Sequence, residues 1–162
     1  MPSAKASPIR DAKNSTTAPI FVDSNVLVYV RDSADKEKQR RAEAWMVELW
    51  RSRRGRLSTQ VLTEFYVNAT QKLRPGLDRE TARADVRGLS AWQPVMLDSA
   101  VFDEAWRIQD RIKLSFWDAL IVGTAQVAGC RYVLTEDLQH AQEIAGVRIV
   151  SPFVAVPSDV GL

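Results

Sequence analysis

The stretch Ile20-Phe21-Val22-Asp23-Ser24-Asn25 decides how the chain folds, because it joins a short apolar run to an acid and then to polar residues. The run 20–23 is typical of a buried strand, and the residues from Ser24 to Val30 are expected to form a helix. A buried strand that passes directly into a helix indicates an α/β fold. Asp23 would then lie at the carboxyl end of a strand, where sheets of this class place their ligand sites.

Apolar spacing and turn residues predict the other elements along the chain. Further strands are expected over residues 56–58, 94–97, 131–134 and 147–150, and helices over 35–53, 59–72, 78–91, 98–113 and 116–128. Strands separated by helices favour a three-layer sandwich, in which helices cover both faces of a central parallel sheet of about five strands. If strands 20–23 and 131–134 are neighbours where strand order reverses, the residues that follow them meet.

The composition is ordinary for one globular domain, since the 162 residues are 46% hydrophobic and 26% charged. We expect a mobile N-terminal extension over residues 1–18, one domain over 19–156 and a C-terminal tail over 157–162. The single Cys130 excludes an intramolecular disulfide framework and a Cys-rich zinc site. No apolar run reaches the roughly 20 residues of a membrane span, and no secretory signal is recognisable, so we expect a cytoplasmic protein.

Four acids interrupt or end runs that are otherwise apolar: Asp23, Glu64, Asp118 and Asp137. A buried carboxylate needs a partner, and Lys and Arg are scarce around these positions. If the fold gathers the four, their natural partner is a hard divalent cation with oxygen ligands, either Mg²⁺ or Mn²⁺. The pattern therefore predicts a metal-dependent phosphoryl-transfer enzyme, most plausibly a nuclease.

Each acid also has a purely structural interpretation. Asp118 follows Ser115 by three residues, as in a helix-capping box, Asp23 could cap the first helix, and Asp137 could cap a short turn. Glu64 lies in the middle of a predicted helix, where it has no cap to make. Four acids at apolar junctions favour a site over four unrelated caps, and Asn25 and Thr135 are placed to support it.

The acids stand in four segments that together resemble a known family. The segments are Phe21-Val22-Asp23-Ser24-Asn25-Val26-Leu27, Ser58-Thr59-Gln60-Val61-Leu62-Thr63-Glu64, Phe116-Trp117-Asp118-Ala119-Leu120-Ile121 and Leu134-Thr135-Glu136-Asp137-Leu138-Gln139. In this order they resemble the PIN-domain ribonucleases, and specifically the VapC-type toxins of toxin–antitoxin pairs. The N-terminal extension departs from the compact pattern of that family.

The resemblance implies a PIN-like domain that cleaves RNA with Mg²⁺ or Mn²⁺. It implies that Asp23, Glu64, Asp118 and Asp137 form the acidic catalytic and metal-binding pocket. It also implies supporting roles for Asn25 and Thr135, a homodimer, and a small cognate antitoxin that covers the active site. Glu136 is an additional acid, which either supports the pocket or is merely exposed.

Basic residues concentrate in the first third of the chain, with a net charge of +5 over residues 1–56 and −3 over 57–162. The densest cluster is Arg51, Arg53, Arg54 and Arg56. Its favoured interpretation is a solvated helix end, and contact with an RNA backbone is the alternative. Trp117 could stack on a base, although core packing is the favoured role.

Two other functions compete with the nuclease. A haloacid-dehalogenase-like phosphatase also places an Asp after its first strand, but it needs a second Asp where this chain has Asn25. A non-catalytic PIN-like module for binding or scaffolding is the other alternative. Four retained acids argue against it, because a scaffold has no use for buried like charges.

Overall fold

The computed structural model describes residues 17–162, and in that range five strands form one sheet in the order β2-β1-β3-β5-β4. The strands are β1 (Ile20–Val22), β2 (Gly55–Arg56), β3 (Tyr132–Leu134), β4 (Glu143–Ile144) and β5 (Val147–Val150). All neighbouring pairs are parallel except β4 and β5, which are antiparallel. This sheet confirms the α/β class expected from the sequence.

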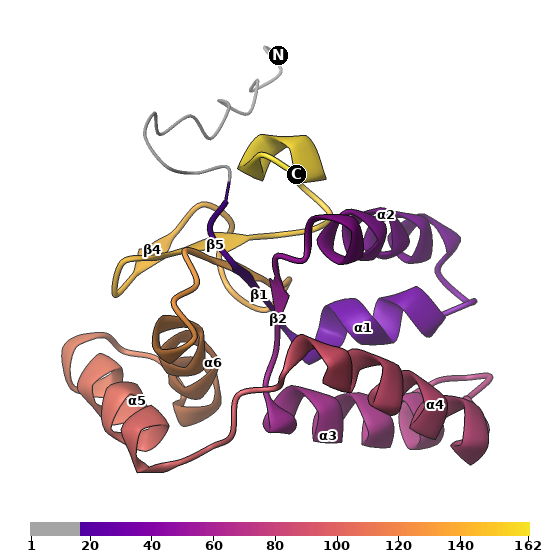
Figure 1. The fold of residues 1–162 in the computed structure, drawn as a ribbon, viewed down its shortest axis with the longest axis horizontal. Helices are drawn as coiled ribbons and strands as arrows, with labels where there is room; N and C mark the ends of the chain where they lie inside the picture. Colours follow the sequence, from indigo (N-terminus) through magenta and orange to yellow (C-terminus); the bar gives the residue numbers. More distant parts are fainter. Residues whose placement is uncertain (1–16) are drawn as a thin grey trace.

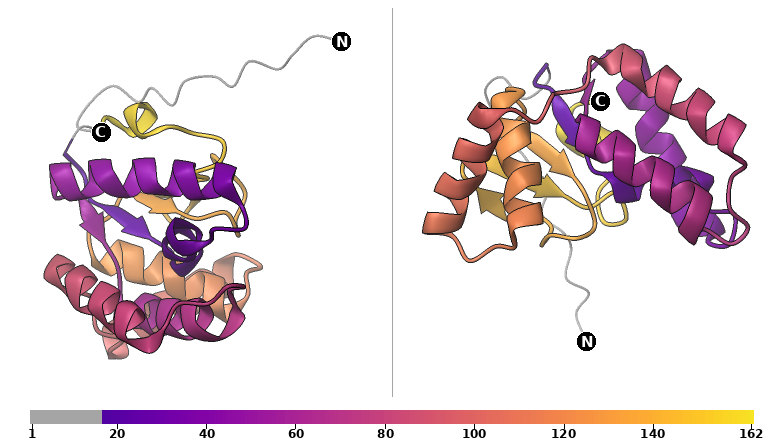
Figure 2. Two further views of the ribbon diagram at one scale, coloured as in Figure 1. Left: turned by 90° about the vertical axis from the view of Figure 1, so that its right-hand side faces the viewer. Right: turned by 90° about the horizontal axis from the view of Figure 1, so that it is seen from below.

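Helices cover the sheet on both sides (Figures 1 and 2), with α2 on one side and α5 and α6 on the other. The helices are α1 (Ser24–Arg31), α2 (Lys36–Ser52), α3 (Thr59–Val67), α4 (Arg79–Leu89), α5 (Ser99–Arg111) and α6 (Phe116–Val127). A π-helical turn, η1 (Asn68–Lys72), continues α3, and the 3₁₀ turns η2 (Ser90–Trp92) and η3 (Pro157–Val160) follow α4 and β5. Within residues 17–162, every helix is too short or too polar to cross a membrane.

Helix α6 is the most buried helix. It packs against β3 and β5 of the sheet, and this burial accounts for its apolar sequence. Its seven consecutive residues from Ala119 to Ala125 are all buried. A Cβ atom at Gly123 would lie 3.0 Å from the backbone nitrogen of Ala105 in α5. The absence of a side chain at Gly123 therefore lets α5 and α6 pack closely beneath the sheet.

The expected strand over residues 94–97 is wrong, because only one parallel bridge forms there, between Ser58 and Val95. Pro94 has no N–H to donate, so the segment begins without a ladder hydrogen bond. The fifth strand is instead β4, which pairs with β5 across a tight turn at Ala145 and Gly146. Both turn residues have positive φ, 51° and 79°, as a two-residue hairpin requires.

Arg54 is buried, which differs from the solvated helix end expected for it. Its side chain is 6% exposed. Its guanidinium donates hydrogen bonds to the backbone oxygens of Ala18 (2.8 Å), Gly161 (2.9 Å) and Val160 (3.1 Å). Arg54 thus ties the residues before β1 to the end of the chain.

The proposed division of the chain at residue 156 stays a prediction. Residues 157–160 form η3, in which Val160 is buried at 1% exposure. The expected mobile extension over residues 1–18 falls almost wholly outside the described residues.

We expect Arg54→Ala to lower the free energy of unfolding by about 2–3 kcal/mol, because it removes a charged donor to buried carbonyls. For a chain of this size the corresponding fall in melting temperature is about 4–10 °C. Thermal unfolding followed by circular dichroism measures this shift. Arg51→Ala, at an exposed position of α2, is the control and should leave the melting temperature nearly unchanged; equal shifts for both variants would contradict the role given to Arg54.

Candidate active site

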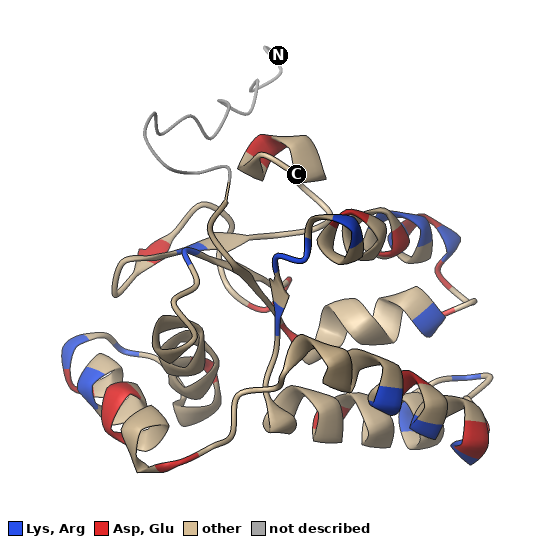
Figure 3. Cartoon of the chain, in the orientation of Figure 1, with Lys and Arg blue, Asp and Glu red and all other residues tan. Residues whose placement is uncertain are grey.

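The site forms where β1 and β3 end side by side. The two strands pair in parallel, with Val22 opposite Leu134, and the N–H of Asp23 donates to the backbone oxygen of Leu134 at 3.0 Å. The next strand of the chain, β2, lies on one side of this pair, and β5 lies on the other. Strand order therefore reverses between β1 and β3, and acidic residues mark this junction (Figure 3).

Asp23 is the most buried of the four acids, at 7% exposure. It caps α1 by accepting a hydrogen bond from the N–H of Ser24 at 2.7 Å. Its second oxygen accepts hydrogen bonds from the Thr135 hydroxyl at 2.8 Å and the Asn25 amide at 3.2 Å. The pKa of Asp23 is raised to about 6, chiefly by burial and to a smaller extent by the charges of Asp137 and Glu64, while the hydrogen bonds from Thr135 and Ser24 oppose the shift.

Asn25 and Thr135 connect Asp23 to Asp137. The Asn25 amide nitrogen lies 3.0 Å from the Thr135 hydroxyl and 3.0 Å from an Asp137 carboxylate oxygen. The Thr135 hydroxyl also accepts the N–H of Asp137 at 3.1 Å. The two residues named from the sequence as supporting positions therefore hold the acids of two strand ends in one hydrogen-bonded network.

Glu64 reaches the same network from α3. One carboxylate oxygen accepts the Ser24 hydroxyl at 2.8 Å, and the other accepts the Gln60 side-chain amide at 2.8 Å. The hydrogen bonds from Ser24 and Gln60 to Glu64 were not predicted from the sequence. The spacing of Gln60 four residues before Glu64 was the available signal, since such pairs share a helix face.

Asp118 stands apart from the other three acids. It lies in the first turn of α6, where its N–H donates to the Ser115 hydroxyl at 3.1 Å and that hydroxyl donates to its carboxylate at 2.7 Å. Within residues 17–162, no hydrogen bond or ion pair joins Asp118 to Asp23, Glu64 or Asp137. The structure thus shows the Ser115 cap directly and gathers three of the four acids.

A cleft of about 400 Å³ opens onto this network, lined by Ser24, Asn25, Val28, Tyr29, Glu64, Asn68, Lys72, Leu73, Glu136 and Asp137. Glu136 has its own partners there, because it accepts the Tyr29 hydroxyl at 2.6 Å and the Lys38 ammonium at 2.9 Å. The Lys38 ammonium also lies 4.5 Å from the centre of the Tyr29 ring and 4.9 Å from that of Phe153. Glu136 is therefore a paired acid that fastens the loop after β3 to α1 and α2.

The arginine cluster lies at the opposite edge of the sheet from the acids, and Trp117 lies on the surface. Arg54 lies beside the first residue of β1, since its backbone oxygen accepts the N–H of Ile20 at 2.8 Å. The cluster therefore lies at the amino ends of the strands, and the acids lie at the carboxyl ends. Trp117 is 64% exposed, so its expected packing in the core is wrong.

The residues present fit a hard divalent cation. Among the described residues, none of the four acids forms an ion pair with Lys or Arg, and Asp23 is buried beside two other carboxylates. The buried Oδ1 of Asn25 has no hydrogen-bond donor in residues 17–162. Carboxylate and amide oxygens are the ligand types such a cation prefers. In the same range no three His, Cys, Asp or Glu side chains already form a ready-made metal site.

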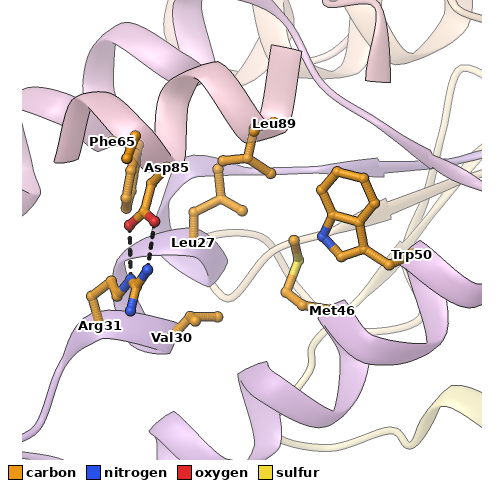
Figure 4. A pocket seen from close by; sticks show the side chains of 10 residues that line it. Leu27, Val30, Arg31, Met46, Trp50, Phe65, Asp85 and Leu89 are labelled. Atoms are coloured by element: carbon orange, nitrogen blue, oxygen red, sulfur yellow. Dashed lines mark hydrogen bonds and ion pairs between the residues drawn. The ribbon is translucent and has the colours of Figure 1, made fainter. Parts of the chain in front are cut away.

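A second cavity of about 250 Å³ lies among α1, α2, α3 and α4. Figure 4 shows its apolar wall, made by Leu27, Val30, Met46, Trp50, Phe65 and Leu89. At one side the Arg31 guanidinium makes a two-pronged contact with Asp85, with the Nε bond at 2.8 Å. The cavity is therefore an apolar groove with a charged edge, separate from the acidic cleft.

Comparison with protein families assigns most of the chain to a known domain family. The model described as "PIN domain" matches residues 20–146, which is more than half of the chain. This match confirms the resemblance drawn from the four acidic segments. No curated protein matches the sequence.

Solved structures with the same fold come from toxin–antitoxin systems. A toxin–antitoxin complex from Klebsiella pneumoniae is 20% identical, with a TM-score of 0.58, and the match covers 83% of this chain and 98% of that one. VapBC2 from Rickettsia felis, bound to a DNA fragment from its promoter, is 11% identical, with a TM-score of 0.53 and coverage of 82% and 97%. VapC20 from Mycobacterium tuberculosis, a sarcin–ricin loop cleaving toxin, is 17% identical, with a TM-score of 0.51 and coverage of 70% and 86%. At these identities the likeness is one of fold.

We expect Asp23→Asn to stabilise the metal-free protein by about 3 kcal/mol near pH 7.5, because it removes a buried charge. The folded pKa of about 6 lies above the ordinary value for Asp. Between those two values the folded protein binds more protons than the unfolded chain, so stability falls as pH rises and levels off above about pH 6.

Urea unfolding in EDTA at about pH 4 and about pH 7.5 measures both effects. The stability difference between Asp23→Asn and wild type should be small at the lower pH and appear at the higher one. A difference that does not change with pH would contradict the raised pKa of Asp23.

Proposed function

The chain belongs to the PIN domain family, and on that premise we propose that it is an endoribonuclease that hydrolyses RNA phosphodiester bonds with Mg²⁺ or Mn²⁺. One observation carries the proposal: Asp23 is buried beside Glu64 and Asp137, which line the cleft, and within residues 17–162 none of the three forms an ion pair with Lys or Arg. The burial of Asp23 beside Glu64 and Asp137 costs stability, which a cation bound among the three carboxylates would offset.

Some side chains of the site would bind the cation, and others hold the acidic side chains in position. Asp23, Glu64 and Asp137 would hold the cation, and Asp118 would join them from the first turn of α6. Ser24 and Gln60 fix both oxygens of Glu64, whereas Asn25 and Thr135 fix Asp23 against Asp137. A bound Mg²⁺ or Mn²⁺ supplies the positive charge that acidifies water and stabilises charge on the attacked phosphate.

Cleavage of RNA by the purified protein tests this proposal. With Mn²⁺ or Mg²⁺ we expect cleavage that EDTA stops and that Asp23→Asn or Asp118→Ala lowers by about a hundredfold or more, since each removes a proposed ligand. Labelled RNA resolved on a denaturing gel gives the rate. Lys36→Ala, at an exposed position of α2 that does not line the cleft, keeps the acids intact and serves as the control for preparation quality.

The alternatives give different outcomes in the same experiment. Metal binding by calorimetry without cleavage of any RNA, together with release of phosphate from a phosphomonoester, would favour the phosphatase. Neither metal binding nor cleavage would favour a non-catalytic binding module. Full metal-dependent activity of Asp23→Asn would remove Asp23 from the mechanism.

We infer further that the chain is the toxin of a toxin–antitoxin pair, because two of its structural relatives were solved as such complexes. The apolar groove in Figure 4 offers a surface for the antitoxin, since an amphipathic helix can lay its apolar face against the exposed Trp50 and the half-buried Val30. Leu27 and Val30 line the groove from α1, and Val28 and Tyr29 of the same helix line the acidic cleft. A segment in the groove would therefore end close to the acids.

A homodimer is the remaining part of the proposal. The exposed ring of Trp106 (53%) stacks on Phe102, which stacks on Phe116, and the exposed ring of Trp117 (64%) meets Phe116 edge-on. Exposed aromatic clusters of this kind are typical of interfaces. We place the second copy on this face of α5 and α6.

Growth of a bacterial host tests the toxin assignment separately from the chemistry. Induced expression of the wild-type chain should arrest growth, and Asp118→Ala at the same protein level should not, because arrest requires RNA cleavage. Optical density after induction, with immunoblots to match expression, measures this. Arrest by both variants alike would show that toxicity does not come from the proposed site.

A further inference from the structure

Two polar side chains beyond the acids share the cleft with them. Asn68 and Lys72 follow Glu64 at intervals of four residues, and all three line the cleft. Residues spaced in this way lie along one side of a helix. The same helical stripe therefore carries a proposed metal ligand at one end and an ammonium group two turns further along.

The backbone of this stripe is unusual where it passes Asn68 and Lys72. Helix α3 continues without a break into the π-helical turn η1, which is closed by the N–H of Leu73 donating to the oxygen of Asn68 at 3.0 Å. Leu73 is 8% exposed and anchors the end of the turn in the core. Single π-helical turns within helices occur frequently at functional sites, because they redirect side chains.

Neither side chain has a partner within the described residues. No hydrogen bond or ion pair in residues 17–162 involves the amide of Asn68 or the ammonium of Lys72. The acids that line the cleft are already engaged: Glu64 by Ser24 and Gln60, Glu136 by Lys38 and Tyr29, and Asp137 by Asn25. Lys72 is also the one Lys or Arg among the residues that line this cleft.

We propose that Asn68 and Lys72 form a phosphate-binding subsite, which holds the RNA backbone next to the bond that is cut. An ammonium and an amide N–H₂ are donors suited to the non-bridging oxygens of a phosphodiester. An anionic strand entering an acidic cleft needs such donors, because the acids repel it everywhere except at the cation. The inference rests on the proposed nuclease function and names the part of the cleft that grips substrate.

The subsite would strengthen the binding of RNA without selecting its base sequence, which other contacts would read. A lysine that contacts phosphate weakens binding to all sequences about equally when it is removed. It also contributes to the salt dependence of binding, by about 0.7 in the slope of log affinity against log salt for a single strand. These two signatures distinguish a phosphate contact from a purely structural role.

The test is binding of a fluorescein-labelled, mixed-sequence, single-stranded RNA to the full chain in EDTA, followed by fluorescence anisotropy over a range of salt. We expect Lys72→Ala to raise Kd about fivefold and to lower the salt slope by about 0.7. Lys72→Arg should restore most of the affinity, and Asn68→Ala should weaken binding to a smaller extent. Lys36→Ala removes the same charge from an exposed position of α2 that does not line the cleft, and should change neither value.

Cleavage kinetics with Mn²⁺ complete the test. Lys72→Ala should raise KM with kcat changed by less than about twofold, because the contact is made equally in the ground state and the transition state. Unchanged Kd and KM for Lys72→Ala, or an equal loss for Lys36→Ala, would overturn the subsite. Binding that depends on Lys72 in a protein that cleaves no RNA would retain the subsite and reject the nuclease, whereas a wild-type chain that binds no RNA in EDTA and cleaves none with Mn²⁺ would reject both.

Discussion

The burial of one carboxylate, that of Asp23, determines how the other acids and their hydrogen-bond donors are arranged around the cleft. The residue ends β1 and caps α1, so the group that makes the strand-to-helix turn is also the group that would meet a cation. Because Asp23 is only 7% exposed, its negative charge destabilises the folded protein, and the nearby charges of Asp137 and Glu64 add to this destabilisation. The protein offsets part of the cost with donors from Ser24, Asn25 and Thr135, which lie on two sides of the acid.

Those donors make the cleft one cooperative unit built from distant parts of the chain. Asn25 and Thr135 are 110 residues apart, and Ser24 and Glu64 are 40 apart. Each contact forms only when β1 lies against β3 and α3 packs beside α1. The acids therefore reach their positions only when the sheet and the helices around it are correctly assembled. The hydrogen bonds of Glu136 to Tyr29 and Lys38 fix the loop that carries Asp137.

Much of this was predictable, because the acids follow strongly apolar runs and strand order in α/β sheets is restricted. The adjacency of β1 and β3 and the roles of Asn25 and Thr135 in the network follow that logic. Strand β4 was not predicted, because it has only two residues. Its turn was not predicted either, because Ala145 adopts a positive φ that alanine rarely has. Burial of Arg54 and exposure of Trp117 depend on where the chain end and α5 lie, and neither position is encoded locally.

Arg54 has a consequence for how the molecule can be handled. Its guanidinium holds Ala18, which precedes β1, within reach of Val160 and Gly161. The two ends of the described chain therefore sit together at the amino-terminal edge of the sheet, and the cleft opens at the opposite edge. A carrier domain or surface tether attached after Leu162 would lie on the side away from the acids. A circularly permuted protein in which Leu162 is joined to Ala18 would need only a short linker.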